Sequence, residues 1–568
     1  MNEIGRTASS LLSLWCNRLL ELMGEDGSVE CKACGISHGR AFDAIYPFMY
    51  QYSITGDRRY LDASLSLFDW AERNVSEEDG SYRNDIDSEW KGTTVFTLIQ
   101  LIDTLDEFGT LIPEDSRQRI EERALRAACF LSDFEDLKTR NINYPVSNSL
   151  AMYLSYRHFG KREFLDACLG FYESYRTCIS RNGLLYGEGR PRNGRTAKLC
   201  RPIDIGYNLM ESIPAIVRLG YETKDSQIIA LGDRLLHAHM PFMLSDGAID
   251  NSFGTRSFKW SYYGSRTADG IAAALLIRAP YDKSLASLAL ENLRMLERCT
   301  FSGLLSGGPG YRKAGQEPCI HHSFTNAKTL AFILSHGLSM DAENRASTAR
   351  YEDGIRMYDE AATAILSENG MSATVTAYDW EYIKEGHPSG GTLSLLHHEK
   401  AGAIAASSMN EYVRKERNNM QEERGEIAFG CTSPRIEKDG LSSIYGYSAS
   451  LSQDGDHVIA EGRLSDESDR QGDDYSLSYS FRKGVFTIDA ECRDSSFILP
   501  VVLYDDDCFS ISGGRASIER KNGWRIVIEG SGMEDGGEVF SLVPGFICRS
   551  LTFPIKDRIG IGIHTEEI

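Results

Sequence analysis

The sequence predicts an α+β multidomain protein, in which an N-terminal (α/α)6-type helical toroid precedes a C-terminal antiparallel β-sandwich. Two observations carry this prediction. Up to about residue 340, glycine turns follow stretches with helical hydrophobic spacing, whereas from residue 369 onward apolar and polar residues alternate between Gly, Asp and Asn turns. We therefore assign residues 1–368 to the toroid and residues 369–568 to the sandwich.

The helical part carries a repeat with the length of one helical hairpin. Its turns contain Gly27, Gly80, Gly183, Gly247 and Gly303, with one interval of double length. Glycine suits these positions because a helix commonly ends with a residue in the left-handed conformation. Between the turns, apolar side chains recur three and four residues apart, as in an amphipathic helix. About six such hairpins can close into a ring whose inner helices line a funnel, with an open solenoid as the alternative.

The C-terminal part reads as a series of short strands. Segments such as residues 474–493 and 523–531 alternate apolar with polar side chains, which is typical of strands with one buried face. The regular spacing of such segments predicts an antiparallel sandwich of about 200 residues. Residues 341–368 join the two parts, and we expect a polar connector followed by a last helix.

The composition limits the class of protein. The chain has 568 residues, of which 42% are apolar, so it can bury more than one core. It has no run of about 18 apolar residues, so no membrane-spanning helix is expected. The first residues read as an amphipathic helix rather than a signal peptide, which predicts a cytoplasmic location.

Thirteen cysteines are scattered without a repeating spacing, which predicts reduced and mostly buried thiols. One CxxC pair, Cys31 and Cys34, is a weak signal, because a zinc or redox site needs a second pair or a thioredoxin-like context. The sequence has no HExxH motif, P-loop or convincing dinucleotide fingerprint. We therefore predict no metal and no cofactor.

The net charge of -21 argues against a nucleic-acid partner, because binding to phosphates favours a basic face. Arginines and lysines nevertheless gather locally, within residues 190–201 and 256–266. Such clusters fit an anionic substrate, and the alternative is a solvated basic surface.

Four polar, glycine-punctuated loops carry the candidate chemistry. In the first, glycines flank Glu188 and let the backbone approach a ligand. The second, residues 201–208, brings an acid, a phenol and an amide together at a helix start, although Asp and Asn also favour helix caps. The third, residues 250–270, combines aromatic rings for stacking with Arg256 and Arg266 for gripping a carboxylate.

The fourth loop contains two adjacent histidines, His321 and His322, beside hydroxyl and amide side chains. A lone histidine is usually structural, but a pair on a polar loop is a better candidate for acid–base work or for binding sugar hydroxyls. Adjacent histidines point in different directions, so we do not expect both to bind one metal.

Several of these motifs resemble one family. Residues 85–96 (DIDSEWKGTTVF), Asn143–Tyr144, and the segments 260–270, 319–328 and 386–402 resemble the heparinase II/III-like group of (α/α)-toroid carbohydrate-active enzymes. The second and third loops look closest to its β-glucuronidase-type glycoside hydrolase branch. The resemblance implies a catalytic toroid that cleaves a glycosidic bond in a uronic-acid-containing saccharide.

Two chemistries fit these residues. Hydrolysis needs paired carboxylates, one to protonate the leaving oxygen and one to activate water or attack the sugar. Elimination needs an Asn or Arg to neutralise the uronate carboxylate, a Tyr or His to take the adjacent proton, and a Tyr to protonate the leaving oxygen.

Of hydrolysis and elimination, we expect hydrolysis. Asn143 is followed here by a tyrosine, whereas the family's lyases usually carry His or Trp at that position, which argues against a lyase. The expected cytoplasmic location also favours an enzyme that trims imported oligosaccharides from one end. The expected activity is an exo-acting β-glucuronidase-type hydrolysis. A lyase is the alternative, and a non-catalytic carbohydrate-binding protein is the third hypothesis.

The candidate catalytic residues each offer an acid, a phenol or an imidazole: Glu188, Asp204, Tyr207, Asp250, His321 and His322. Glu211, one turn beyond the second loop, is a further acid. The candidate substrate-binding residues offer rings, amides or guanidinium groups: Asn143, Tyr144, Arg201, Asn208, Arg256, Trp260, Tyr263 and Arg266. The expected partner is a uronic-acid-containing oligosaccharide, with no nucleic acid and no membrane, and homo-oligomerisation is left open.

Overall fold

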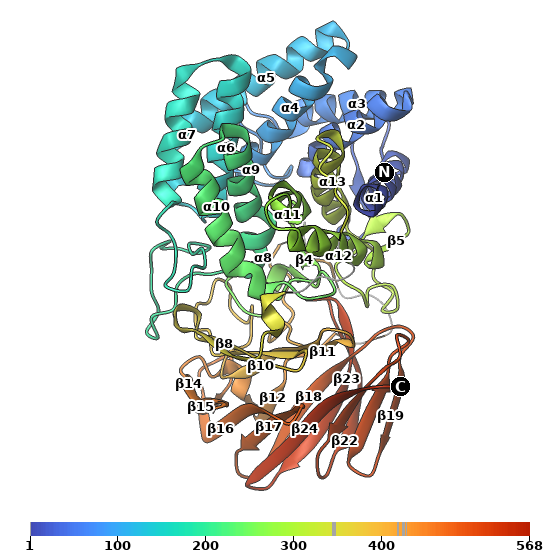
Figure 1. Ribbon diagram of the computed structural model, residues 1–568. Coiled ribbons are helices and arrows are strands. Elements are labelled where there is room, and N and C mark those ends of the chain that lie inside the picture. Colours follow the sequence, from blue (N-terminus) through green and yellow to red (C-terminus); the bar gives the residue numbers. More distant parts are fainter. Residues whose placement is uncertain (1, 343–347, 417–419, 423–426, 428) are drawn as a thin grey trace.

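The computed structural model describes residues 2–342, 348–416, 420–422, 427 and 429–568. A helical part and a β part lie one above the other, with the N-terminus among the helices and the C-terminus in the β part (Figure 1). Among the described helices, none is both long enough and apolar enough to cross a membrane.

The helical part consists of inner and outer helices. The inner helices are α2 (Ile45–Thr55), α4 (Thr94–Phe108), α6 (Asn143–Phe159), α9 (Ile213–Thr223), α11 (Ala272–Arg278) and α13 (Ile320–Ser335). Their outer partners are, in the same order, α3 (Arg58–Asn74), α5 (Glu114–Asp133), α7 (Arg162–Tyr175), α10 (Ser226–His239), α12 (Ser284–Arg298) and α1 (Glu3–Glu21). A short helix α8 (Ile205–Tyr207) and a π-helical turn, Asn208–Ser212, lead into α9.

The helices close into a ring. Each inner helix contacts the next inner helix in chain order, and α13 packs back against α2. Because the last inner helix meets the first, the ring is closed rather than an open solenoid, and the predicted (α/α)6-type toroid is confirmed.

The repeated glycine turns contribute to this closure. Each of these glycines has a positive φ, and each lies so close to the next outer helix that a Cβ would clash with it. Gly27 approaches α3, Gly80 approaches α5, Gly183 approaches α10, Gly247 approaches α12 and Gly303 approaches α1. At Gly80, for example, a Cβ would lie 2.4 Å from the carbonyl oxygen of Arg126. Glycine is therefore needed twice over, for its backbone conformation and for the close approach.

The β part consists of two main sheets and a few short hairpins. The smaller sheet is antiparallel, in the order β11–β10–β9–β8–β7, with β7 (Gly354–Tyr358), β8 (Thr363–Glu368), β9 (Met371–Thr376), β10 (Thr392–His398) and β11 (Gly402–Ala406). The larger sheet contains β12 (Arg435–Lys438), β13 (Leu441–Ser442), β14 (Ser450–Asp454), β15 (His457–Ser465), β16 (Gln471–Arg482), β17 (Val485–Glu491), β18 (Ser495–Leu503), β19 (Cys508–Ser512), β20 (Arg515–Glu519), β21 (Trp524–Glu529), β22 (Glu534–Ser541), β23 (Phe546–Ile555) and β24 (Arg558–Glu567). Three hairpins interrupt the helical part: β1–β2 (Glu30–Cys31, Ile36–Ser37), β3–β4 (Trp260–Ser261, Gly264–Ser265) and β5–β6 (Thr300–Phe301, Leu304–Leu305).

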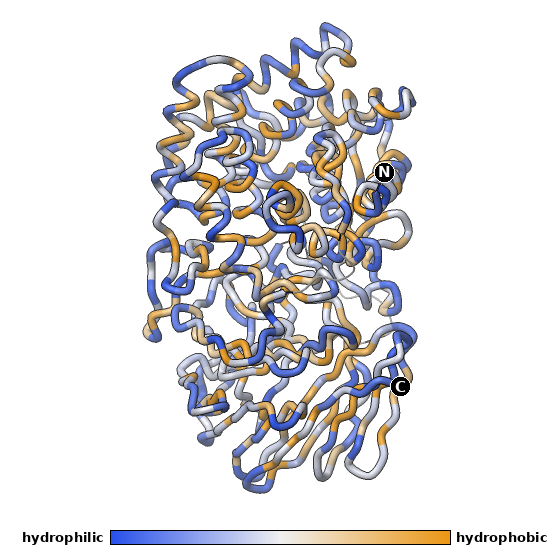
Figure 2. Tube along the Cα trace, viewed as in Figure 1, coloured by the Kyte–Doolittle hydropathy of each residue, from blue (hydrophilic) through white to orange (hydrophobic). Residues whose placement is uncertain are grey.

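The two sheets pack face to face, so the predicted antiparallel sandwich is confirmed. Leu366 and Leu396 of the smaller sheet share a core with Leu477 and Phe497 of the larger one. Hydrophobic and hydrophilic residues alternate along many strands of the lower half in Figure 2, as expected for strands with one buried face.

The smaller sheet lies between the helices and the larger sheet (Figure 1), and both of its faces are covered. On β8, Leu366 points into the sandwich core, while its neighbour Ile365 belongs to the core of the helical part. The apolar run of β8 therefore lacks the alternation of a half-buried strand.

The predicted last helix within residues 341–368 is wrong. Residues 343–347 lie outside the described part of the chain, and the described rest forms β7 and β8 with two short 3-10 turns, Ala349–Tyr351 and Asp359–Ala361, instead of an α-helix. Gly354 and Ala362 both have positive φ, at 130° and 41°, which breaks helical continuity. The first strand of the smaller sheet thus begins at Gly354 rather than after residue 368.

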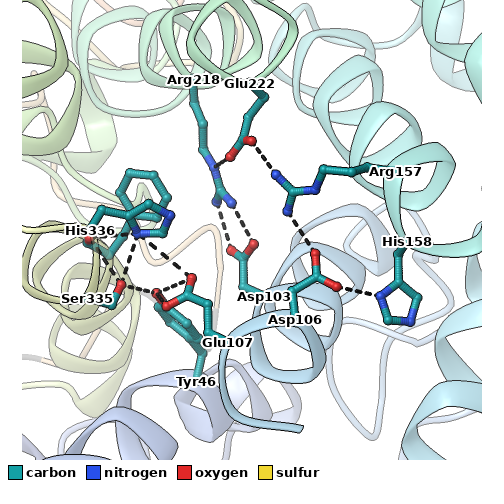
Figure 3. Close-up of polar contacts among 11 residues, drawn as sticks. Tyr46, Asp103, Asp106, Glu107, Arg157, His158, Arg218, Glu222, Ser335 and His336 are labelled. Atoms are coloured by element: carbon teal, nitrogen blue, oxygen red, sulfur yellow. Dashed lines mark hydrogen bonds and ion pairs between the residues drawn. The ribbon is translucent and has the colours of Figure 1, made fainter.

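A partly buried polar network joins the inner helices (Figure 3). Arg218 of α9 donates two hydrogen bonds to Asp103 of α4, at 2.8 and 2.5 Å. On the same side of α4, Glu107 accepts a 2.9 Å hydrogen bond from Tyr46 of α2. The tyrosine hydroxyl also contacts Ser335 of α13 at 2.7 Å. These contacts link helices that lie far apart in the sequence.

We predict that Arg218→Met lowers the free energy of unfolding by about 3–5 kcal/mol, because Asp103 is left as an uncompensated buried charge. Chemical denaturation followed by circular dichroism measures this change. The matched control is Arg58→Met, which breaks the exposed Arg58–Asp62 pair and should cost less than about 1 kcal/mol. Equal effects of the two substitutions would contradict a stabilising role for the network.

Candidate active site

An open cleft of about 660 Å³ lies where the helical part faces the β part. Its walls come from segments that are distant in the chain: the loops before α2 and α4, the start of α6, α8, residues 256–267 and the start of α13. Tyr382, from the loop after β9, and Glu416, from the segment after β11, complete the wall from the β part. Ring closure therefore gathers these segments at a single cavity.

Asn143, the first residue of α6, lies on the cleft and is held by two acids. Its side-chain amide donates a 2.7 Å hydrogen bond to Glu211, and its backbone N–H donates a 2.9 Å hydrogen bond to Glu188. Burial and the nearby Asp269 carboxylate raise the pKa of Glu211, which favours the neutral acid. Because a side-chain amide has two N–H donors, Asn143 has a second one for a ligand.

Tyr207, at the end of α8, presents its hydroxyl to the cleft. The hydroxyl contacts Thr267 and accepts a 3.4 Å hydrogen bond from the Lys259 ammonium. The Arg256 guanidinium lies 4.6 Å from the centre of the Tyr207 ring. Burial raises the pKa of Tyr207 even though Lys259 and Arg256 oppose the shift, so the phenol stays protonated at neutral pH.

His321 lies on the cleft in the first turn of α13, which is a helix rather than the predicted loop. Its side chain is buried, and neither ring nitrogen forms a hydrogen bond with another described residue. Burial, followed by the charge of Arg40, lowers the pKa of His321 well below its usual value. The imidazole is therefore neutral and has a nitrogen available to accept a proton.

Glu188 lies fully buried behind the cleft and supports two of its groups. One carboxyl oxygen accepts the Asn143 backbone N–H, and the other lies 3.2 Å from Nε of Arg256. Burial raises the pKa of Glu188 to about 7, although the Arg256 charge acts in the opposite direction. Arg256 itself lies between the rings of Tyr207 and Tyr382, 4.6 and 4.8 Å from their centres.

Aromatic side chains form a further part of the cleft wall. The Trp90 indole N–H donates a 2.8 Å hydrogen bond to the Tyr144 hydroxyl, and the two rings meet edge to face at 5.1 Å. The Arg140 guanidinium lies 4.9 Å from the Trp90 ring. A fixed pair of rings of this kind suits the apolar face of a sugar.

The cleft is locally cationic although the chain carries a net charge of -21. Its basic side chains are Arg40, Arg140, Arg190, Arg256 and Lys259, and its acidic ones are Asp85, Asp87, Glu211 and Glu416. Since the raised pKa of Glu211 favours its neutral form, the described lining has an excess of positive charge. This balance fits an anionic ligand.

The structure brings only some of the predicted site residues to the cleft: Asn143, Tyr144, Tyr207, Arg256, His321 and the further acid Glu211. The other candidate catalytic residues are engaged elsewhere. Asp204 caps α8 by accepting the backbone N–H of Tyr207, and it also accepts the backbone N–H of Arg256. Asp250 forms a buried ion pair with Arg350 at 2.9 Å, and the His322 ring packs against Tyr263 at 6.4 Å.

The remaining candidate binding residues fix the loops behind the cleft. Arg201 pairs with Glu360, and Asn208 donates to the Leu185 carbonyl. Trp260 donates to the Ile249 carbonyl, Arg266 donates to Tyr311, and Tyr263 is buried. None of these side chains belongs to the described lining of the cleft.

Several lining residues were missed as site residues from sequence. Trp90 lies inside the DIDSEWKGTTVF segment, and Lys259 belongs to the second basic cluster, so both carried a signal. Arg40 and Tyr382 stand in segments without a motif. Their positions depend on contacts with distant segments, which single-sequence patterns do not reveal.

Comparisons with known proteins agree with this architecture. The family model described as "Ulvan lyase N-terminal domain" matches residues 8–352, and "Ulvan lyase C-terminal domain" matches residues 355–565. A broad-specificity ulvan lyase of Formosa agariphila is 31% identical over 532 residues, which cover 88% of this chain and 83% of that protein.

Two solved structures are similar in fold. Heparinase III has a TM-score of 0.51 at 11% identity, and the alignment covers 92% of this chain and 76% of that one. A chondroitin AC lyase of Streptomyces coelicolor A3 has a TM-score of 0.54 at 11% identity, with 99% and 79% covered. At such identities the likeness concerns the fold alone, and it confirms the heparinase-like toroid.

The predicted β-glucuronidase-type glycoside hydrolase is wrong. The matching family models and the Formosa relative are named as lyases. The physical reason for the error is visible at the cleft: Glu188, Asp204 and Asp250, the carboxylates assigned to hydrolysis, all serve as buried partners of other residues.

We predict that Glu188 makes folding stability pH-dependent. Its pKa is about 7 in the folded protein and about 4.3 in an unfolded chain, so the folded state binds more protons between these values. The contribution of this group to the free energy of unfolding should therefore fall by about 4 kcal/mol as pH rises through that window.

Urea denaturation at a series of pH values measures this slope. Glu188→Gln should flatten it, because glutamine cannot titrate, whereas the exposed control Glu25→Gln should leave it unchanged. A Glu188→Gln variant with the wild-type slope would exclude this assignment.

Proposed function

Because the chain belongs to the ulvan lyase family, we propose that it is a polysaccharide lyase that cleaves ulvan beside a uronic acid by β-elimination. One observation carries the proposal: Asn143, Tyr207 and His321 reach the same cleft from three different helices. An amide, a phenol and an imidazole are the groups that elimination requires, whereas hydrolysis requires two carboxylates.

The first task is to bind and neutralise the uronate carboxylate. Asn143 donates its second amide N–H to this group, and Glu211 fixes the amide through the 2.7 Å hydrogen bond. The cationic lining supplies the attractive field, to which Arg256 and Lys259 contribute. Withdrawing charge from the carboxylate makes the hydrogen on the neighbouring C5 more acidic.

Proton transfer then involves His321 and Tyr207. The neutral His321 imidazole takes the C5 proton, and the electrons of the C–H bond form the C4–C5 double bond as the C4–O bond breaks. Tyr207 donates its hydroxyl proton to the departing oxygen, and the Lys259 ammonium, 3.4 Å away, stabilises the phenolate that remains. Solvent returns a proton to Tyr207 and removes the one on His321.

The aromatic wall orients the sugar for this chemistry. Trp90 and Tyr144 are held rigidly by their mutual hydrogen bond, so they offer a fixed surface at little entropic cost. A sugar ring stacked there lies in the same cleft as the three reacting side chains.

The reaction in ¹⁸O-labelled water tests elimination against hydrolysis. We expect ulvan products with the ultraviolet absorbance of a conjugated C4–C5 double bond and without ¹⁸O, because elimination adds no water. Ulvan whose carboxyl groups have been reduced to alcohols should not be cleaved. Products that carry one ¹⁸O and no double bond would refute the proposal, and so would the absence of any cleavage.

We predict that Tyr207→Phe lowers kcat by about 10²–10⁴-fold, because the proton donor to the leaving oxygen is removed. Initial rates followed by ultraviolet absorbance measure this, with the melting temperature as a check on folding. The control Tyr172→Phe removes a hydroxyl on outer helix α7 and should keep the wild-type rate. If Tyr207→Phe also keeps that rate, Tyr207 is not the acid.

A further inference from the structure

Four sulfur and nitrogen ligands meet behind the cleft. Cys31, Cys34, His38 and Cys319 are all buried, and one ligand atom of each lies within 4.8 Å of the others. Sγ of Cys319 is 3.7 Å from Sγ of Cys31, 3.4 Å from Sγ of Cys34 and 3.6 Å from Nε2 of His38. The proposed elimination uses none of these side chains.

The local backbone directs the first two thiols to one side. Cys31 ends β1 and Cys34 lies in the turn of the β1–β2 hairpin, where Gly35 has a φ of 66° and donates a 2.7 Å hydrogen bond to the Cys31 carbonyl. A left-handed glycine directly after the second cysteine lets the CxxC turn fold back on itself. His38 follows the hairpin at once, so three ligands come from one short segment.

The fourth ligand comes from the other end of the helical part. Cys319 is the N-cap residue of α13, 288 residues from Cys31 in the chain. The sequence predicted no metal because the CxxC pair had no visible second half. The fold supplies the two further ligands, Cys319 and His38.

We propose that these four side chains bind one Zn²⁺ ion as a structural site. Metal–sulfur bonds of about 2.3 Å and metal–nitrogen bonds of about 2.0–2.1 Å in a tetrahedron place the sulfurs about 3.8 Å apart and the nitrogen about 3.6 Å from each sulfur. The three separations from Sγ of Cys319 lie within a few tenths of an ångström of these values. Soft thiolates with an imidazole select zinc.

The surroundings of His38 also suit this role. With Nε2 directed at the thiols, its other ring nitrogen lies 4.0 Å from the Asp85 carboxylate, which is itself fixed by the Gly39 backbone N–H at 2.9 Å. A carboxylate on the far side of a ligating imidazole is a frequent partner of zinc sites. Four protein ligands leave no open position, so the ion would hold structure and take no part in catalysis.

A disulfide explains the cluster less well. A disulfide joins two sulfurs at about 2.05 Å, whereas Cys319 lies at comparable, longer distances from both partners. A disulfide between two of the cysteines would also leave the third thiol and the His38 imidazole directed at that bond, and it would not explain their positions. The arrangement of three thiols around one point favours a shared cation.

Metal analysis of the full-length protein, produced with zinc in the medium, tests the proposal. We expect about one zinc per chain by plasma mass spectrometry, and Co²⁺ added in its place should give the visible spectrum of a tetrahedral thiolate site. Cys34→Ser and Cys319→Ser should retain less than about one fifth of the zinc. The matched control Cys508→Ser, which removes an exposed thiol on β19, should retain all of it.

If the serine variants do not fold, the zinc content and Co²⁺ binding of the wild-type protein test the proposal. Wild-type chains that contain no zinc and bind no Co²⁺ would overturn the proposal. So would a thiol titration in denaturant, without reductant, that finds two thiols fewer than the thirteen cysteines, since it would reveal a disulfide. Full zinc in a folded Cys319→Ser variant would equally exclude this site.

Discussion

Closure of the helical ring is the constraint on which the rest of the structure depends. Asn143, Tyr207 and His321 come from three different hairpins, and only a ring brings the ends of those hairpins to one cavity. The repeated glycine turns help to set its curvature, because each lets one hairpin pack closely against the next outer helix. The cleft is therefore a product of the repeat, although no single repeat contains it.

Within that frame, buried acids position the groups that face the substrate. Glu188 holds both the start of α6 and Arg256, and Glu211 holds the Asn143 amide. Their raised pKa values show that burial outweighs the attraction of nearby cations. These carboxyls serve better as hydrogen-bond partners than as charges, which leaves the cationic side chains of the lining available to an anionic sugar.

The sequence predicted the fold class because helical spacing, glycine turns and strand alternation are local signals. It also named Tyr207 and His321, which stand on conspicuous polar loops, and Asn143 through the family resemblance, and all three line the cleft. It failed on the carboxylates because a catalytic acid and an acid that holds an arginine look alike in sequence. Asp250 is the clearest case, since its partner Arg350 lies 100 residues further along. The strand β8 was missed for a related reason: both faces are covered, by two different cores.

The four ligands meet at the seam of the ring, the place where α13 closes it by packing against α1 and α2. A metal ion would be useful there. Elsewhere, neighbouring hairpins are joined by the chain itself, but α13 meets α1 and α2 through non-covalent contacts alone. An ion held by Cys31, Cys34, His38 and Cys319 would cross-link the two ends of the helical part at that seam. A link between residues so distant in sequence restricts the unfolded chain more than a local link does. It would also fix the first turn of α13, where His321 lies two residues beyond Cys319.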